Sequence, residues 1–225
     1  MRVVLSIGGS SINPEGKPDI EFLRKMAKML KESKHEFGIV TGGGSIARAY
    51  ANAARELGAG EYDADSIAIV STKQNAHIVI AALGGAAHPN VPATFEQART
   101  AFDGHKAVVM GGTIPGITTD SDSALLAEAI GAKRLVNISN VEGIFDSDPR
   151  KNPNAKKFAT LSYDQLIALA AESDKRTAGT HFVFDMLACK LIARSKIETH
   201  FVSCRNMKDI AEAIEGKKHG GTVVR

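Results

Sequence analysis

The stretch Phe37-Gly38-Ile39-Val40-Thr41-Gly42-Gly43-Gly44-Ser45 joins an apolar, β-branched run directly to three glycines and a serine. It predicts a buried strand over Phe37–Thr41, a tight glycine loop, and then a helix that ends near Gly58. The runs Val3–Ile7 and Ala107–Met110 are also apolar and are also followed directly by glycines. In an open α/β sheet ligands bind outside the carboxyl ends of the strands, so we expect all three glycine loops at that edge.

Short β-branched runs alternate with amphipathic stretches along the whole chain, which is typical of an α/β fold with a parallel or mixed sheet. No internal repeat or long linker is visible, so we expect one domain, or two closely joined lobes that meet near Asp120. Phe145–Phe158 is rich in Asp, Asn, Pro and Lys and predicts an exposed hairpin or loop. The other predicted strands are Arg134–Ile138, Thr199–Ser203 and Thr222–Val224. The other predicted helices are Asp19–Lys34, Asp65–Leu83, Phe95–Phe102, one capped by Thr119 or Asp120 that ends at Ile130, Ser162–Ala171, Phe184–Arg194 and Met207–Ile214.

The composition favours a globular protein of a reducing compartment. The 225 residues carry a net charge of +3, 44% hydrophobic residues, 5% aromatic residues and no Trp, which argues against a nucleic-acid-binding surface. No window approaches the roughly 18 apolar residues of a membrane span, and the first residues lack the apolar stretch of a signal peptide. The spacing of Cys189 and Cys204 matches no zinc-binding pattern, so we expect both to be buried, reduced thiols. We therefore expect a cytoplasmic location.

The glycine loops Gly8-Gly9-Ser10, Gly42–Ser45 and Gly111-Gly112-Thr113 each end on a hydroxyl residue. Glycine lets backbone N–H groups approach a ligand closely, and a following helix N-terminus adds a positive dipole. A single loop of this kind is as consistent with a tight turn as with a site, but three of them favour phosphate binding. The Walker A motif and a G-x-G-x-x-G after the first strand are absent, so the design differs from that of P-loop kinases and dinucleotide-binding folds.

Four segments together resemble a known family. They are Ile7-Gly8-Gly9-Ser10, Thr41-Gly42-Gly43-Gly44 with Arg48, Met110–Gly116 with Thr118-Thr119-Asp120, and Asn140–Phe145 with Asp148-Pro149. In this order, and over essentially the whole chain, they are similar to the archaeal-type uridylate kinases of the amino acid kinase superfamily. GGG-x3-R and GGTxPGxTTD are the specific parts of the match.

The resemblance implies a three-layer αβα sandwich around a central, mainly parallel open sheet. It implies one amino acid kinase domain over residues 1–225, with UMP in the half before about residue 120 and ATP in the half after it. The implied reaction is reversible transfer of the γ-phosphoryl group of ATP, as MgATP, to UMP, giving UDP and ADP in pyrimidine nucleotide synthesis. It further implies a ring-like homohexamer built as a trimer of dimers, with no nucleic-acid or membrane partner.

The resemblance also assigns residues by position. Those implied to bind ATP are Gly9, Ser10, Gly44, Arg48, Ser139, Asn140, Phe145 and Asp148. Those implied to bind UMP are Gly43, Asp65, Thr113, Ile114, Pro115, Gly116, Ile117, Thr118 and Thr119. Arg48 and Asp120 are the implied catalytic residues, with Asp120 ordering the phosphate-binding groups and the Mg²⁺ shell, and no side chain is assigned as a metal ligand.

These residues also have ordinary structural interpretations. Arg48 could be a solvated surface residue, and Asp65 or Asp120 could cap a helix. The threonines could be turn and cap residues, and Asp148 a turn residue. Asp63 could compete with Asp65 for the ribose.

The chain departs from the family pattern in its cations. Many kinases of this fold carry a lysine in the first strand–loop segment, where this chain has Ser6-Ile7-Gly8-Gly9, and a second lysine would fall near Phe182. Charge neutralisation then rests on Arg48, Mg²⁺, backbone amides and Lys190. Ser139 and Phe145 replace a common Thr and Tyr, so adenine stacking is retained while one hydroxyl is lost.

Other activities fit the same fold. Isopentenyl phosphate, carbamate and acetylglutamate kinases are the alternatives among enzymes, and a non-catalytic nucleotide- or oxyanion-binding protein is the alternative outside catalysis. No histidine lies near the GGG segment, unlike the pattern of isopentenyl phosphate kinases. An acyl-phosphate-forming kinase would keep the lysines that are absent here. Arg48, Asp65, Asp120 and the TxPGxTT loop together favour an enzyme.

Overall fold

A twisted sheet runs through the centre of the protein in the computed structural model, which describes residues 1–149, 152–174 and 184–225. Within these residues the strand order is β3-β2-β1-β4-β6-β7-β5. The strands are β1 (Arg2–Ile7), β2 (Glu36–Thr41), β3 (Ala107–Met110), β4 (Arg134–Ser139), β5 (Thr160–Leu161), β6 (Glu198–Ser203) and β7 (Thr222–Val224). All the predicted strands are present, and the short β5 is an addition that the sequence did not predict.

The strand directions place a topological switch point at the centre of the sheet. Strands β3, β2, β1, β4 and β6 are parallel, whereas β7 is antiparallel to β6 and parallel to β5. From β1 the chain builds outward through β2 and β3, then returns to place β4 on the other side of β1. Ligands of open α/β sheets bind where the strand order reverses, so the carboxyl ends of β1 and β4 are the expected crevice.

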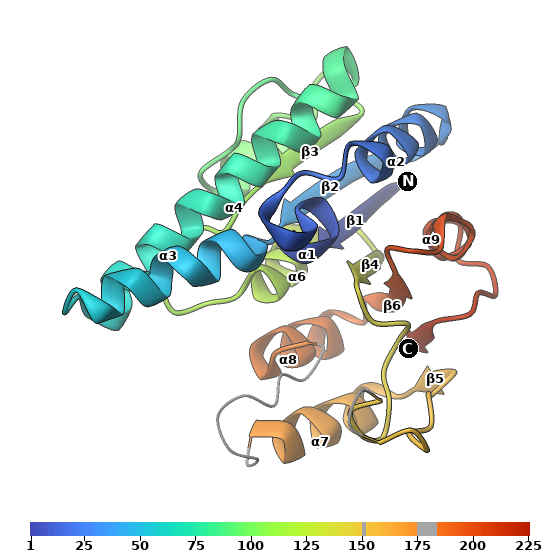
Figure 1. Ribbon diagram of the computed structural model, residues 1–225. Coiled ribbons are helices and arrows are strands. Elements are labelled where there is room, and N and C mark those ends of the chain that lie inside the picture. Colours follow the sequence, from blue (N-terminus) through green and yellow to red (C-terminus); the bar gives the residue numbers. More distant parts are fainter. Residues whose placement is uncertain (150–151, 175–183) are drawn as a thin grey trace.

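Helices cover both faces of the sheet, which confirms the three-layer αβα sandwich (Figure 1). One hydrophobic core joins the sheet to α2, α4 and α9, and the other joins it to α5, α6, α7 and α8. Because both faces are covered, most strand residues are buried, and most of the buried ones are apolar. The helices are α1 (Gly9–Ile12), α2 (Ile20–Glu32), α3 (Gly44–Glu56), α4 (Glu61–Leu83), α5 (Phe95–Thr100), α6 (Thr119–Ala129), α7 (Tyr163–Asp174), α8 (Met186–Ser195) and α9 (Met207–Ile214), with 3₁₀ turns at Pro14–Gly16 and Gly84–Ala86.

Helices α3 and α4 form a hairpin that extends beyond the edge of the sheet (Figure 1). They pack on each other through the small residues Ala51, Ala54 and Ala64, which let two helices approach closely. Helix α4 starts at Glu61 with Gly60 as its N-cap, so the start predicted at Asp65 was wrong. Glu61, Asp63 and Asp65 all lie near this helix start. Acidic residues are favoured throughout the first turn of a helix, so they do not identify which residue begins it.

Two other boundaries differ from prediction. Helix α6 is capped by Thr118, whose Oγ1 accepts from the Ser121 N–H, and not by Thr119 or Asp120. The loop Gly8-Gly9-Ser10 coils at once into the one-turn helix α1, which its glycines gave no reason to expect. In the predicted hairpin or loop Phe145–Phe158, of which residues 150–151 lie outside the described ranges, Phe145 and Lys157 form an isolated antiparallel bridge, so the described parts are hairpin-like.

Neither cysteine forms a disulfide; Cys189 is buried as predicted, whereas Cys204 is only partly buried. Among the helices of the described ranges, none combines the length and apolar character required to cross a bilayer.

Candidate active site

The first two glycine loops are in backbone-to-backbone contact. The Gly8 N–H donates to the Ile138 carbonyl and the Gly42 N–H donates to the Ile7 carbonyl, each at 2.9 Å, so both loops leave the sheet side by side. A Cβ on Gly9 would lie 2.5 Å from the Gly43 carbonyl carbon. Gly44 begins α3 with φ +69°, a conformation that favours glycine. The structure therefore brings Gly9, Gly43 and Gly44 together, as predicted.

Arg48 lies one turn into α3, directly after this glycine contact. Its side chain is exposed, and no described residue forms a hydrogen bond or ion pair with it. A guanidinium without a partner beside a helix N-terminus is available to an incoming anion. Ser10, in α1, is half-buried at the same loop.

The third loop, Gly111–Thr119, is held from beneath by two buried side chains. The Gly112 N–H donates to Thr72 Oγ1 at 2.7 Å. The Thr113 N–H and hydroxyl donate to the two carboxylate oxygens of Asp122 at 3.2 and 2.6 Å. Farther along, the Gly116 N–H donates to Asp65 Oδ2 at 2.9 Å. Asp65 thus supports the loop from the second turn of α4, whereas Asp63 is exposed.

The end of this loop is tied to α8 by Asp185. Its carboxylate caps α8 by accepting from the Ala188 N–H at 3.0 Å, and it also accepts from the hydroxyls of Thr118 and Ser121. The Thr118 hydroxyl is therefore already used twice, once toward Asp185 and once as the cap of α6. Thr119 is the first residue of α6 and is half-buried. Ile114 and Gly116 are exposed, and Pro115 and Ile117 are half-buried.

Asp120 occupies the switch point between β1 and β4. Its Oδ1 accepts from the Ser6 hydroxyl on β1 at 3.0 Å and from the Asn137 amide on β4 at 2.9 Å. Ser6 therefore places a neutral hydroxyl beside Asp120. Burial and the nearby negative charge of Asp185 raise the pKa of Asp120 to about 7, although the hydrogen bonds from Ser6 and Asn137 act to lower it. Asp120 is therefore not a helix cap but a poorly neutralised carboxylate at the expected crevice.

The residues predicted for adenine and ribose follow the end of β4. Ser139 Oγ accepts from the Val141 N–H at 3.2 Å and so shapes the turn that begins there. Asn140 is exposed, while Phe145 and Asp148 are half-buried in the hairpin-like loop. Lys190 is exposed on α8, and Phe182, the position of the second family lysine, lies outside the described residues.

A magnesium ion carried by a nucleotide fits the chemistry of this crevice. Within residues 1–149, 152–174 and 184–225 no group of three or more His, Cys, Asp or Glu side chains could hold a metal alone. Asp120 does offer one carboxylate oxygen, Oδ2, that has no hydrogen-bond donor among the described residues. One carboxylate with the remaining ligands from phosphate and water is how proteins usually hold Mg²⁺.

Sequence reasoning missed the residues that support the loops. Thr72, Asp122 and Asp185 each accept hydrogen bonds from the third loop or its end. Asp185 directly precedes an apolar helix, which is an N-cap signal. Asp122 looked like an ordinary acidic residue in a first helical turn, and Thr72 is far from any motif, so neither carried a readable signal.

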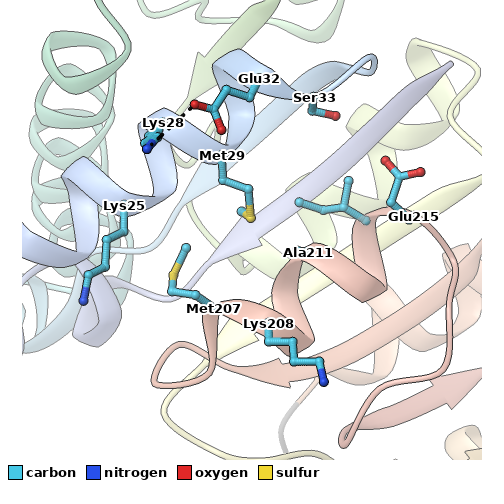
Figure 2. A pocket seen from close by; sticks show the side chains of 10 residues that line it. Lys25, Lys28, Met29, Glu32, Ser33, Met207, Lys208, Ala211 and Glu215 are labelled. Atoms are coloured by element: carbon cyan, nitrogen blue, oxygen red, sulfur yellow. Dashed lines mark ion pairs between the residues drawn. The ribbon is translucent and has the colours of Figure 1, made fainter.

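A separate groove of about 510 Å³ lies between α2 and α9 (Figure 2). Met29, Met207, Ala211 and Ile214 contribute its apolar part, and lysine and glutamate side chains surround them. None of the residues predicted to bind ATP or UMP lines this groove. The candidate site is therefore the set of loops at the strand ends.

Comparison with known proteins adds to this geometry. Residues 1–203 match the model of the amino acid kinase family. The uridylate kinase of Thermococcus kodakarensis is 45% identical over 226 residues, covering 100% of this chain and 99% of that protein. The crystal structure of uridylate kinase from Archaeoglobus fulgidus superimposes with a TM-score of 0.88 at 39% identity, covering 100% of both chains. The fold is shared by UMP kinase from Bacillus anthracis, which superimposes with a TM-score of 0.81 at 21% identity. The match covers 100% of this chain and 95% of that one.

Proposed function

Because this chain belongs to the amino acid kinase family and matches uridylate kinases over its full length, we propose that it transfers a phosphoryl group from ATP to UMP. It is a nucleoside-monophosphate kinase that forms UDP and ADP reversibly, in the supply of pyrimidine nucleotides. The observation that carries this assignment is the set of three strand-end loops around the β1/β4 switch point. Two of them join backbone to backbone, and the third is held rigidly beside them.

The glycine loops supply the phosphate contacts. Gly9, Ser10 and Gly44 present backbone N–H groups and a hydroxyl to the phosphates of ATP at the start of α1 and α3. Gly43 and the loop Thr113–Thr119 hold UMP, with Asp65 accepting from ribose hydroxyls through its carboxylate. Ser139, Asn140, Phe145 and Asp148 line the adenosine side. In this arrangement the half before residue 120 binds UMP and the half after it binds ATP.

Transfer is direct: a UMP phosphate oxygen bonds to the γ-phosphorus as the bond to the β–γ bridging oxygen of ATP breaks. Such a reaction needs positioning and charge stabilisation more than a strong base. Arg48 places a permanent positive charge at the helix N-terminus where negative charge develops. Asp120 orders the groups around the phosphates, and bound Mg²⁺ neutralises phosphate charge. We assign the reaction to the cytoplasm.

A substrate panel tests the function. ADP release would be followed with UMP, CMP, dUMP, carbamate, acetylglutamate and isopentenyl phosphate as acceptors, with MgATP in excess. We expect UMP to give the highest kcat/KM. If UMP gave no turnover while another acceptor did, the activity would be that of the corresponding kinase. Nucleotide binding in equilibrium dialysis with no transfer to any acceptor would identify a binding protein instead.

Arg48→Ala and Arg48→Lys accompany the panel as matched variants. Arg48 is exposed, so we expect the alanine variant to lose about 10- to 100-fold in kcat with UMP, because a charge near solvent contributes less than a buried one. Lysine should recover part of this loss, since it restores the charge without the planar fork of donors. Equal rates for all three proteins would show that another cation serves the transferring phosphoryl group.

Self-association through the α3–α4 hairpin, as one contact of a homohexamer, is also proposed. Four apolar or aromatic residues of this hairpin expose between 63% and 89% of their surfaces: Tyr50 on α3, its C-cap residue Leu57, and Tyr62 and Val70 on α4. Exposed apolar residues gathered on one element mark an interaction surface, and a second copy of the chain would cover it symmetrically.

Light scattering tests this contact. Leu57→Lys should lower the molecular mass of the assembly, because it places a charge in the contact. Ile20→Lys is the control, since Ile20 is also exposed, at 52%, but lies on α2. A monomeric parent protein, or an unchanged mass for Leu57→Lys, would disprove this contact.

A further inference from the structure

Asp122 is a buried carboxylate that serves one neighbour. It lies in the first turn of α6 and is 1% exposed. Its Oδ2 accepts from the Thr113 N–H and its Oδ1 from the Thr113 hydroxyl, and no other hydrogen bond to its side chain occurs among the described residues. Burial raises the pKa of Asp122 to about 6, against the two hydrogen bonds from Thr113 and the nearby positive charge of Lys73. The geometry of the two hydrogen bonds points to a role of the carboxylate at Thr113.

The geometry around Asp122 shows what the carboxylate does. One residue earlier, Thr72 Oγ1 accepts from the Gly112 N–H at 2.7 Å. A Cβ on Gly111 would lie 2.8 Å from Lys73 N, so α4 packs directly on this backbone. The start of the loop is thus clamped between α4 and α6, while Ile114 and Gly116 beyond it are exposed. Asp122 is the last fixed point before the exposed part of the loop.

Asp122 also sets the direction of the Thr113 hydroxyl. A carboxylate only accepts, so the Thr113 hydroxyl must use its proton toward Asp122. What the hydroxyl then has left for a ligand is its oxygen lone pairs. Thr113 consequently offers an acceptor, which suits an N–H or O–H group of the nucleoside and not a phosphate oxygen.

We propose that Asp122 is a positioning residue of the phosphoryl-acceptor site, acting through Thr113 to fix the path of the loop Thr113–Thr119 and the polarity of its first hydroxyl. This inference rests on the proposed function, since UMP is the ligand that the loop is assigned. It predicts that loss of Asp122 changes KM for UMP and leaves KM for ATP unchanged. Asp122 itself does not touch the reacting atoms.

The test compares kinetics and stability of the full-length enzyme. Asp122→Ala removes both bonds, so KM for UMP should rise about tenfold or more with KM for ATP unchanged, because a displaced binding loop weakens the ligand it holds. Asp122→Asn should raise KM for UMP less than alanine does: its oxygen still accepts from the Thr113 N–H and keeps the loop path, but its amide donates to Thr113 Oγ1 and no longer fixes the direction of the hydroxyl proton. Neither variant should have a lower thermal midpoint than the parent at pH 8, where the parent buries a charge.

A double-mutant cycle with Thr113→Val separates this role from direct binding by Thr113. Thr113→Val removes the hydroxyl bond to Asp122 and keeps the N–H bond, so the losses of UMP affinity in Asp122→Ala and Thr113→Val should be less than additive in the double variant. Ser123→Ala is the matched control, because it removes a buried hydroxyl on the same helix that bonds only to the Thr119 carbonyl. Its KM for UMP should match that of the parent.

The outcomes are distinct. An unchanged KM for UMP in Asp122→Ala, additive effects in the cycle, or equal losses for the alanine and asparagine variants would each overturn the proposal. A parent enzyme with no turnover of UMP would refute the proposed function instead.

Discussion

Asp120→Asn should lower kcat about 100-fold or more and at the same time make the folded protein more stable at pH 8. The loss of activity follows from removing the negative charge of Asp120 at the β1/β4 switch point, where the Mg²⁺-bound phosphates are proposed to be ordered. The asparagine oxygen can still accept from Ser6 and Asn137, so the geometry is kept while the charge is lost. The variant thus isolates charge from shape.

The gain in stability follows from the raised pKa. Asp120 titrates near 3.8 in an unfolded chain and at about 7 in the folded protein. A raised pKa means that the folded state holds the proton more tightly. The stability from this group is therefore fully present below pH 3.8 and is lost as the pH rises through about 7. The difference of about 3 pKa units corresponds to a loss of at most about 4 kcal/mol in the free energy of unfolding of the parent at pH 8. The asparagine variant has no group that titrates here and does not undergo this loss.

Thermal unfolding of the ligand-free protein from pH 4 to pH 8 checks this expectation. The two proteins should unfold at similar temperatures at pH 4, and the variant should unfold several degrees higher at pH 8, at about 2–4 °C per kcal/mol for a chain of this size. Asp103→Asn, which makes the same change at an exposed carboxylate, should alter neither rate nor midpoint. Unchanged activity in Asp120→Asn would remove Asp120 from the mechanism. A less stable variant at pH 8 would show that the carboxylate is already neutralised.

The parts of the fold that the sequence predicted are those set by local pattern. Strands β1, β2 and β3 are short, mostly apolar runs that are each followed directly by glycines, so these strands and their loops were predictable from the local sequence. The strand order was not, because β7 pairs antiparallel with β6 through contacts between Thr199 and Val224 that no local signal encodes.

The site divides in the same way. The residues proposed to contact a ligand belong to short motifs, and the structure places Gly9, Gly43 and Gly44 in contact. Residues that support the motifs act across the sheet or between helices. Asp122 and Thr72 lie 9 and 40 residues from the amides they bind. Their role depends on tertiary position, so residue type and spacing could not reveal it.

Gly9→Ala should strongly weaken the binding of MgATP. Its Cβ would lie 2.5 Å from the Gly43 carbonyl carbon and 2.6 Å from Gly44 Cα, and both neighbours are backbone that cannot rotate away. The backbone of Gly9 does not have a positive φ, so alanine meets no conformational strain of its own. The whole effect is steric: the two loops assigned to the ATP phosphates must move apart.

We expect kcat/KM for MgATP to fall about 100-fold, because displacing phosphate-binding amides by an ångström has effects of that order. We also expect an overpacking penalty of about 1–3 kcal/mol in the free energy of unfolding. Steady-state kinetics and urea denaturation measure the two effects. Gly85→Ala is the matched control, since its Cβ would meet no atom within 4 Å, and it should behave as the parent. If Gly9→Ala kept full affinity for MgATP, the contact between the two loops would not be what forms the phosphate site.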